Sequence, residues 1–151
     1  MVKHTPKFVP KDSTELSEKF VSYIMSDGKK TTARRVFHDC LKIIETRGYK
    51  SPAQTFEKAV RNVTPSLEVR AKRIGGSVYQ IPVEVQPKRQ LALSFRWIIG
   101  AAKGKKGSGL ARRLADEIIE ACEGTGTAMK KKDDVFRMAQ ANKAFAHFAR
   151  Y

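Results

Sequence analysis

Apolar residues recur every three to four positions through most of the chain, a spacing that places them on one face of a helix. The first such stretch carries Leu16, Phe20, Tyr23 and Ile24. It follows a sequence at 12–15 that resembles a capping box, and an Asp-Gly pair at 27–28 ends it. The pattern therefore predicts an amphipathic helix near the start of the chain.

Two further helices are predicted before residue 65. The second begins among residues 29–32, ends at 47–48, and has a buried face that comprises Val36, Phe37, Cys40, Leu41 and Ile44. The third has Ser51 as its N-cap and Pro52 at the first helical position, where a proline sacrifices no hydrogen bond. Pro65 follows its end.

The segment 65–85, PSLEVRAKRIGGSVYQIPVEV, breaks this pattern and predicts a β-hairpin over residues 67–86. Runs rich in β-branched residues flank Gly75–Gly76, and glycine supplies the positive φ that a tight hairpin turn requires. Pro82 marks the second strand as an edge, because proline cannot donate a backbone hydrogen bond. Two strands alone bury little apolar surface, so we expect the hairpin to lean on helices at its base and to project its tip.

Three helices are predicted after the hairpin. Pro87 introduces the fourth, and a flexible basic linker at 104–109 leads to the fifth, which ends at 123–124. The last helix contains Val135, Met138 and Phe145. The apolar faces of the fourth and fifth helices comprise Leu91, Phe95, Ile98 and Ala102, and Leu110, Leu114, Ile118 and Ala121. The fold class is therefore mainly α, a single domain of about six helices over 13–151 with a protruding two-stranded β-hairpin, preceded by a flexible basic N-terminal extension over 1–12.

The net charge of the chain restricts the possible functions more than any sequence motif does. The chain has 30 Lys+Arg against 15 Asp+Glu, a net charge of +15 and a pI near 10.1, which is unfavourable for a compact fold unless a polyanion neutralises it. Nucleic acid is the expected partner. No apolar run approaches the roughly 20 residues of a membrane span, and no signal or transit segment is predicted at 1–10. Cys40 and Cys122 fall on apolar helix faces and are expected to be reduced, which favours a cytosol-like compartment.

Several stretches of the chain resemble enzyme or cofactor motifs but lack the residue spacing that those motifs require. The linker glycines at 104–109 follow a helix rather than a strand and lack the phosphate-loop sequence, and 124–126 lacks the third glycine of a dinucleotide fingerprint. Three scattered histidines and two cysteines give no metal-ligand spacing, so neither metal nor cofactor is predicted. Asp116, Glu117 and Glu120 follow Arg112 and Arg113 by one helical turn, and local ion pairing explains them better than acid–base chemistry does.

The closing segment, 130–151, leaves two interpretations open. Phe145, Phe148 and Tyr151 recur at three-residue steps, which is compatible with core packing. The same aromatic residues lie beside His147 and Arg150, which is equally compatible with stacking on exposed bases.

Four segments in this order resemble the bacterial or organellar family of small-subunit ribosomal protein seven. They are EKFVSYIMSDGKKTTARRVF (18–37), PSLEVRAKRIGGSVYQIPVEV (65–85), RQLALSFRWIIGAA (89–102) and KKKDDVFRMAQANKAFAHF (130–148). The resemblance covers nearly the whole chain from residue 18 onward. It departs from many bacterial members at the start, where Lys3, His4, Lys7 and Lys11 stand in place of a more arginine-rich tail.

Membership implies a structural constituent of the small ribosomal subunit rather than an enzyme. It implies binding to the 3′ major domain of the small-subunit rRNA, nucleation of head assembly, and a position beside the exit-site tRNA and the mRNA path. It also implies contacts with small-subunit ribosomal proteins nine and eleven, on a ribosome in the cytoplasm or in an organelle.

The basic clusters are the candidate contacts with RNA. Lys29, Lys30, Arg34 and Arg35 gather at a helix start, where the helix dipole disfavours cations unless a ligand is bound. A second set recurs every seventh residue along the fourth helix. The candidate RNA-binding residues are Lys3, Lys7, Lys29, Lys30, Arg34, Arg35, Arg70, Lys72, Arg73, Arg89, Arg96, Lys103, Lys105, Lys106, Arg112, Lys130, Lys131, Lys132, Arg137 and Lys143.

Two other classes of protein are alternatives to this prediction. A helix-turn-helix DNA-binding protein needs a recognition helix with side chains aimed at base edges, and the sequence shows basic stripes without such a helix. An RNA-modifying enzyme needs a cofactor pocket or an acid–base set, neither of which the motifs supply. Co-purification with small ribosomal subunits would separate all three.

Overall fold

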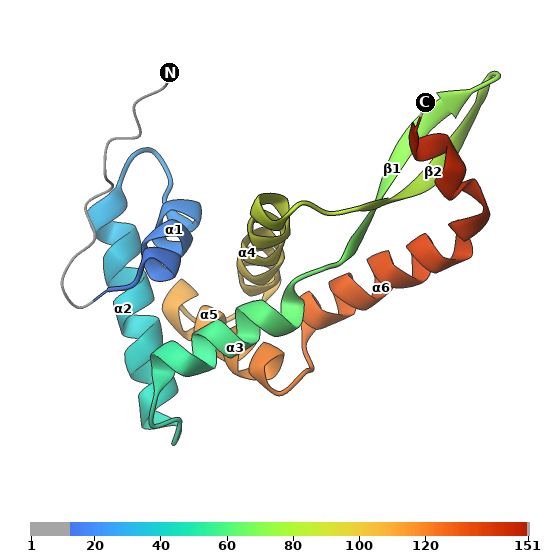
Figure 1. The fold of residues 1–151 in the computed structure, drawn as a ribbon. Helices are drawn as coiled ribbons and strands as arrows, with labels where there is room; N and C mark the ends of the chain where they lie inside the picture. The colour runs from blue at the N-terminus through green and yellow to red at the C-terminus, as the bar shows by residue number, and fades with distance from the viewer. Residues whose placement is uncertain (1–12, 151) are drawn as a thin grey trace.

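The computed structural model describes residues 13–150 and arranges them as a helical body with a β-ribbon at one side (Figure 1). Strands β1 (Leu67–Ile74) and β2 (Ser77–Glu84) form this ribbon. The predicted mainly α single domain with a protruding two-stranded hairpin is confirmed. The helices are α1 (Glu15–Ile24), α2 (Lys30–Thr46), α3 (Pro52–Val63), α4 (Pro87–Gly104), α5 (Leu110–Cys122), α6 (Thr127–Ala141) and the 3₁₀-helix η1 (Lys143–Arg150).

Local sequence sets where several helices begin. The Thr14 hydroxyl oxygen caps α1 by accepting a hydrogen bond from the Ser17 backbone N–H at 3.2 Å. Pro52 and Pro87 stand at the first positions of α3 and α4, as predicted. Ser51 occupies the N-cap of α3, but its side chain makes no capping hydrogen bond.

A cluster of aromatic rings forms the centre of the helical body. Phe20 of α1 is fully buried, and its ring centroid lies 5.3 Å from that of Phe37, 4.8 Å from that of Phe56 and 5.1 Å from that of Phe95. These four rings come from α1, α2, α3 and α4, and α5 packs against α2, α3 and α4. The core therefore depends on residues from both sides of the ribbon in sequence.

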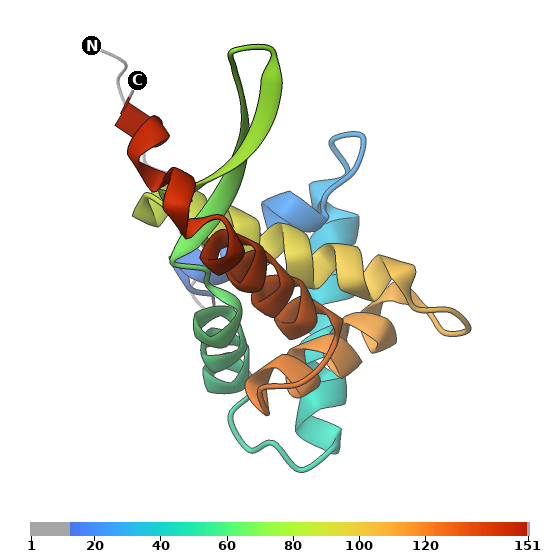
Figure 2. The same ribbon diagram turned by 90° about the vertical axis from the view of Figure 1, so that its right-hand side faces the viewer.

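The ribbon has the turn that the glycine pair predicts. Gly75 and Gly76 have φ values of 57° and 86°, and the strands pair antiparallel with Ile74 opposite Ser77 and Leu67 opposite Glu84. The buried residues of the main core cluster all lie in helices, whereas the tip of the ribbon stands clear of the helical body (Figure 2).

The C-terminal segment differs from the single last helix that the periodicity predicts. Helix α6 ends at Ala141, and η1 then packs against β2, with the ring of Tyr79 5.0 Å from that of Phe145 and 5.9 Å from that of Phe148. These two phenylalanines therefore form neither the main core nor a free stacking surface, because they cover the ribbon. Tyr151 lies outside the described residues.

Several apolar residues of the predicted helices are not fully buried, and Val36, Leu41 and Leu110 are among those that are only partly buried. Tyr23 is 39% exposed and packs edge-on against Phe95, Met138 is 48% exposed, and Leu91 is only partly buried. Helix α6 extends beyond the core to reach the ribbon, so its middle residues have fewer helices to pack against.

A buried carboxylate anchors the start of α6, and the acids of α5 do not form the local ion pairs that the sequence predicts. Glu117 is fully buried and accepts a hydrogen bond from the Ala128 backbone N–H at 2.8 Å. Lys105 Nζ lies 3.1 Å from Glu117 Oε2, outside hydrogen-bond alignment, and donates to Glu120 at 3.0 Å. Asp116 pairs with Arg47 of the α2–α3 connection. The partners are distant in sequence because the acids face neighbouring segments rather than the preceding helical turn.

We expect Gly126→Ala to destabilise the protein more than Gly124→Ala does. Both glycines have positive φ, but Gly126 has φ 95° and ψ 176°, and a Cβ there would lie 2.7 Å from Glu120 Oε2, whereas a Cβ at Gly124 meets nothing within 4 Å. The free energy of unfolding, measured by urea denaturation, should fall by at least about 1 kcal/mol more for Gly126→Ala. Equal losses would contradict the close approach of Glu120.

Replacing residues 72–78 with a short glycine-containing turn should leave the helical body folded. The main core cluster draws on no residue of this segment, so the melting temperature should change by no more than about 4 °C and the helical circular dichroism should persist. Global unfolding of this variant would show that the ribbon tip belongs to the core.

Candidate nucleic-acid interface

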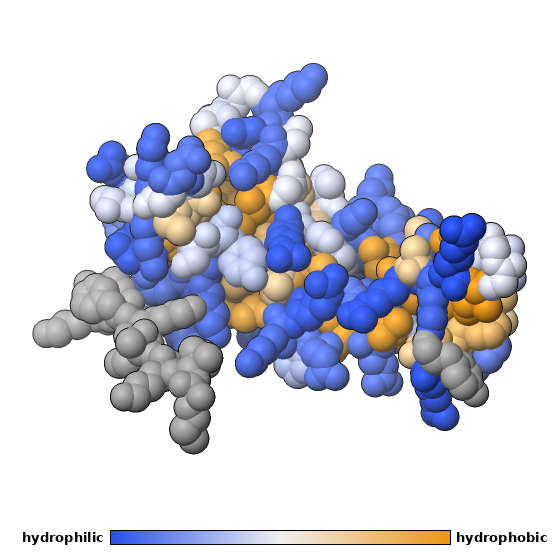
Figure 3. Space-filling model, turned by 90° about the horizontal axis from the view of Figure 1, so that it is seen from above, coloured by the Kyte–Doolittle hydropathy of each residue, from blue (hydrophilic) through white to orange (hydrophobic). Residues whose placement is uncertain are grey.

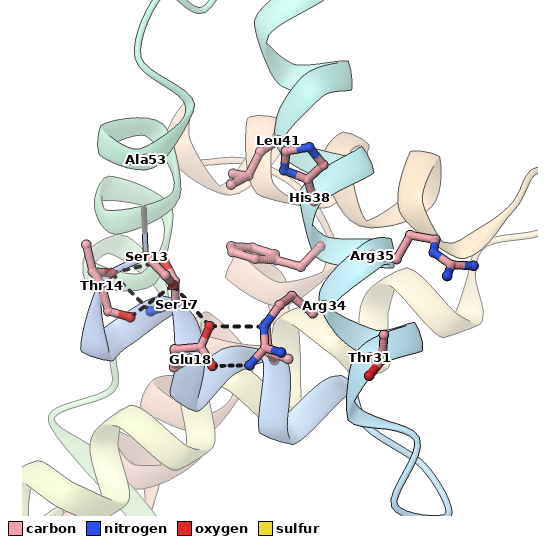
Figure 4. Close-up of a pocket in the computed structure, with 12 residues that line it drawn as sticks. Ser13, Thr14, Ser17, Glu18, Thr31, Arg34, Arg35, His38, Leu41 and Ala53 are labelled. Atoms are coloured by element: carbon pink, nitrogen blue, oxygen red, sulfur yellow. Dashed lines mark hydrogen bonds and ion pairs between the residues drawn. The ribbon is translucent and has the colours of Figure 1, made fainter. Parts of the chain in front are cut away.

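The first basic cluster lies where α1 packs on α2. Arg34 Nη2 donates to Glu18 Oε2 at 2.8 Å, and the Ser13 hydroxyl donates to Glu18 Oε1 at 3.1 Å (Figure 4). The hydrogen bond from Arg34 lowers the pKa of Glu18, although burial opposes the shift, and the same pairing raises the pKa of Arg34. The pair borders a cavity of about 460 Å³, whereas the Arg35 side chain points away from the pair. Lys29 and Lys30 are exposed.

A second cluster lies at the base of the ribbon. Glu68 of β1 is only 7% exposed and accepts hydrogen bonds from Arg70 Nε at 3.0 Å, Arg70 Nη2 at 2.9 Å and Arg89 Nε at 2.8 Å. Burial by itself raises the pKa of Glu68, but the hydrogen bonds from Arg89 and Arg70 outweigh it and hold that pKa below its ordinary value. One carboxylate therefore fixes two of the predicted cations.

A third group follows α4. Arg89, Arg96 and Lys103 are all exposed, which confirms the face that the seven-residue repeat predicts. The guanidinium carbon of Arg96 lies 6.0 Å from the ring centroid of Tyr23, and Arg96 and Lys131 both line a groove between α4 and α6. The structure thus brings together cations that lie 35 positions apart in sequence.

Besides Arg34, Arg70 and Arg89, four further predicted cations have partners within the protein. Lys105 pairs with Glu117 and Glu120, Lys72 Nζ donates to the Phe148 carbonyl at 3.0 Å, and Lys132 Nζ donates to the Asn62 carbonyl at 2.7 Å. Arg137 Nη1 lies 3.7 Å from Asp134 at the surface. Partial burial would lower the pKa of Lys105, but the hydrogen bond to Glu120 and the ion pair with Glu117 outweigh it and raise that pKa.

The other predicted cations in the described residues are exposed, and Lys3 and Lys7 lie outside those residues. In Figure 3 hydrophilic residues cover much of the face shown, and hydrophobic residues show between them over the helical body and at the end that holds the ribbon and the C-terminal segment. The exposed cations not yet placed are Arg73, Lys106, Arg112, Lys130 and Lys143.

The described residues show no metal-ligand cluster, no membrane-spanning helix and no disulfide. Between residues 13 and 150 no group of three His, Cys, Asp or Glu side chains could hold a metal ion. No helix in that part of the chain is long and apolar enough to cross a membrane. Cys40 and Cys122 are free thiols, as predicted, and burial raises the pKa of Cys40 to about 12.

Comparison with known families decides the identity. A family model described as ribosomal protein S7p/S5e matches residues 1–143 of the chain. The chain belongs to the ribosomal protein S7 family. The S7 family comprises structural, rRNA-binding constituents of the small ribosomal subunit and is not a family of enzymes.

Sequence reasoning found the cations of this S7 protein but missed the acids that hold them. Glu18 and Glu68 are the buried carboxylates beneath Arg34 and beneath the Arg70–Arg89 pair. The signal for Glu68 was available, because residues 68 and 70 alternate onto the same face of one strand. No local signal links Glu18 with Arg34 or Glu68 with Arg89, since these partners meet only through tertiary packing.

The Glu18–Arg34 pair should make stability depend on acid pH. The folded state lowers the pKa of Glu18 from its ordinary 4.5, so the stabilisation is present above that value and is lost as pH falls through the folded-state pKa. Glu18→Gln should therefore cost about 1 kcal/mol at pH 7, a value limited by the half-exposed Arg34, and this cost should shrink progressively as the pH falls below 4.5. Urea denaturation at a series of pH values from 7 downward checks this, with Glu45→Gln as the control on an exposed carboxylate. A Glu18→Gln deficit that does not decrease at any acid pH would contradict the assignment.

Proposed function

We propose that this S7 protein binds the 3′ major domain of the small-subunit rRNA and nucleates assembly of the subunit head. The observation that carries the proposal is the exposed row of Arg89, Arg96 and Lys103 along α4, joined by Lys131 across the groove to α6. Such a surface is long enough to contact several phosphates along an RNA backbone rather than a single anion, because an 18-residue helix rises about 27 Å.

Recognition on this surface would rest on phosphates and shape. Each cation that neutralises a phosphate releases condensed counterions, which favours binding without reading the sequence. The deep major groove of A-form RNA hides base edges from side chains, so a folded junction is recognised mainly through its backbone geometry. The rigid helical body, with its ribbon held by η1, supplies a fixed counterpart to such a junction.

The same proposal includes neighbours on the ribosome. We infer that the ribbon side lies near the exit-site tRNA and the mRNA path, and that small-subunit ribosomal proteins nine and eleven contact this protein. Val78 at the ribbon tip is 64% exposed, and Phe136 and Met138 of α6 are each 48% exposed. Exposed large apolar side chains of this kind are compatible with protein contacts. The ribosome concerned is cytoplasmic or organellar.

Binding of the full-length protein to a transcript of the 3′ major domain should depend steeply on salt. Engagement of six or so phosphates predicts a slope steeper than about −4 in a plot of log affinity against log salt concentration. Filter binding over a range of potassium chloride concentrations measures this slope. A flat slope, or equal affinity for duplex DNA of the same length, would refute the proposed function.

The α4 surface can be tested with a charge-matched control. Arg96→Gln with Lys103→Gln should weaken rRNA binding and flatten the salt slope by about 1.4 to 1.8, while stability changes by less than about 1 kcal/mol. The control, Lys50→Gln with Lys58→Gln, removes two exposed charges near and on α3 and should leave the slope nearly unchanged. Equal effects of the two pairs would remove the α4 surface from the interface.

A further inference from the structure

The carboxylate at the base of the ribbon is unusual because it is almost buried yet contacts two arginines that remain exposed. Glu68 is 7% exposed, whereas the side chains of Arg70 and Arg89 are 61% and 46% exposed. Burial of a carboxylate is unfavourable unless it is paired and hydrogen-bonded, and here two guanidiniums from different elements supply both. The three residues join β1 to the first turn of α4.

Each guanidinium has nitrogen donors that make no hydrogen bond to Glu68. Arg89 reaches Glu68 through its Nε alone, at 3.0 Å from Oε1 and 2.8 Å from Oε2. Arg70 uses its Nε and its Nη2, both on Oε1. Nη1 of Arg70 and both Nη groups of Arg89 therefore make no bond to Glu68. Because guanidinium donors are fixed in one plane, anchoring Nε also fixes the directions of the remaining donors.

We propose that Arg70 and Arg89 form a clamp for one phosphodiester of the RNA backbone, and that Glu68 is the positioning residue of this clamp. The inference rests on the proposed rRNA binding. Glu68 holds the two guanidiniums side by side, so both are ordered before RNA arrives. A phosphodiester has two unesterified oxygens, each able to accept hydrogen bonds from one guanidinium. Ordering the side chains in advance reduces the entropy lost on binding.

The clamp and simple electrostatics predict opposite effects of one substitution. Glu68→Gln removes a negative charge beside an anion-binding surface, which by Coulomb attraction alone should strengthen RNA binding. If Glu68 positions the arginines, the same change should instead weaken binding to the 3′ major domain transcript by about tenfold. Glu84→Gln is the matched control, because Glu84 is an exposed carboxylate at the same end of the ribbon, on its other face. It should leave binding unchanged or slightly stronger.

A second measurement tests whether Glu68 acts through the arginines. In the Arg70→Gln/Arg89→Gln background, adding Glu68→Gln should cause no further loss of affinity, whereas a general structural role would still reduce it. The two arginine substitutions should also be coupled, so that the double variant loses less affinity than the product of the two single losses. This arginine cycle substitutes only exposed residues, so it tests whether the two arginines share one phosphate even if Glu68→Gln fails to fold.

The outcomes separate this inference from the proposed function. If the parent protein does not bind the transcript with a steep salt slope, the proposed function fails. If the parent binds but folded Glu68→Gln binds as tightly or more tightly, Glu68 does not position the arginines. If the losses from Arg70→Gln and Arg89→Gln simply multiply, the two arginines do not share one phosphate, and the clamp is refuted.

Discussion

Buried carboxylates that hold cations from distant parts of the chain are the interactions on which the rest of this structure depends. A net charge of +15 disfavours the compact fold through repulsion between cations, and ion pairs with buried carboxylates reduce this repulsion within the protein. Glu18 joins α1 to α2, Glu68 joins the ribbon to α4, and Glu117 joins α5 to the linker through Lys105 and to the start of α6. Each therefore fixes the relative position of two elements as well as a charge.

These carboxylates also divide the cations into two groups. Lys105 is only 24% exposed at its side chain and pairs with two acids, which makes it part of the fold. Arg70 and Arg89 pair with one acid but keep donors toward solvent, and Lys103 and Lys131 are exposed. The net charge of the chain does not distinguish between these two groups of cations. Their different environments suit different tasks, since paired lysines stabilise the helical body and exposed cations can meet phosphates.

Local sequence was sufficient for elements whose signals lie within a few residues. Gly75–Gly76 requires positive φ at a turn, and Pro52 and Pro87 suit first helical positions, so the hairpin and two helix starts were predictable. The end of α6 could not be predicted from the sequence, because η1 is held by contacts with β2 rather than by its own periodicity. Partners of the acids on α5 were mispredicted for the same reason. Nearest neighbours in sequence are poor guides where an acid faces another segment, as Asp116 faces Arg47.

Lysine-modification footprinting with and without the 3′ major domain transcript tests the central claim most directly, because it reports the buried and the exposed cations in one experiment. An amine-reactive reagent and mass spectrometry give the reactivity of each lysine in the folded protein. The account predicts that RNA protects Lys103 and Lys131, that Lys58 reacts equally in both states, and that Lys105 reacts slowly in both. Unchanged reactivity of Lys103 and Lys131 on RNA binding, or rapid reaction of Lys105 in the free protein, would contradict it.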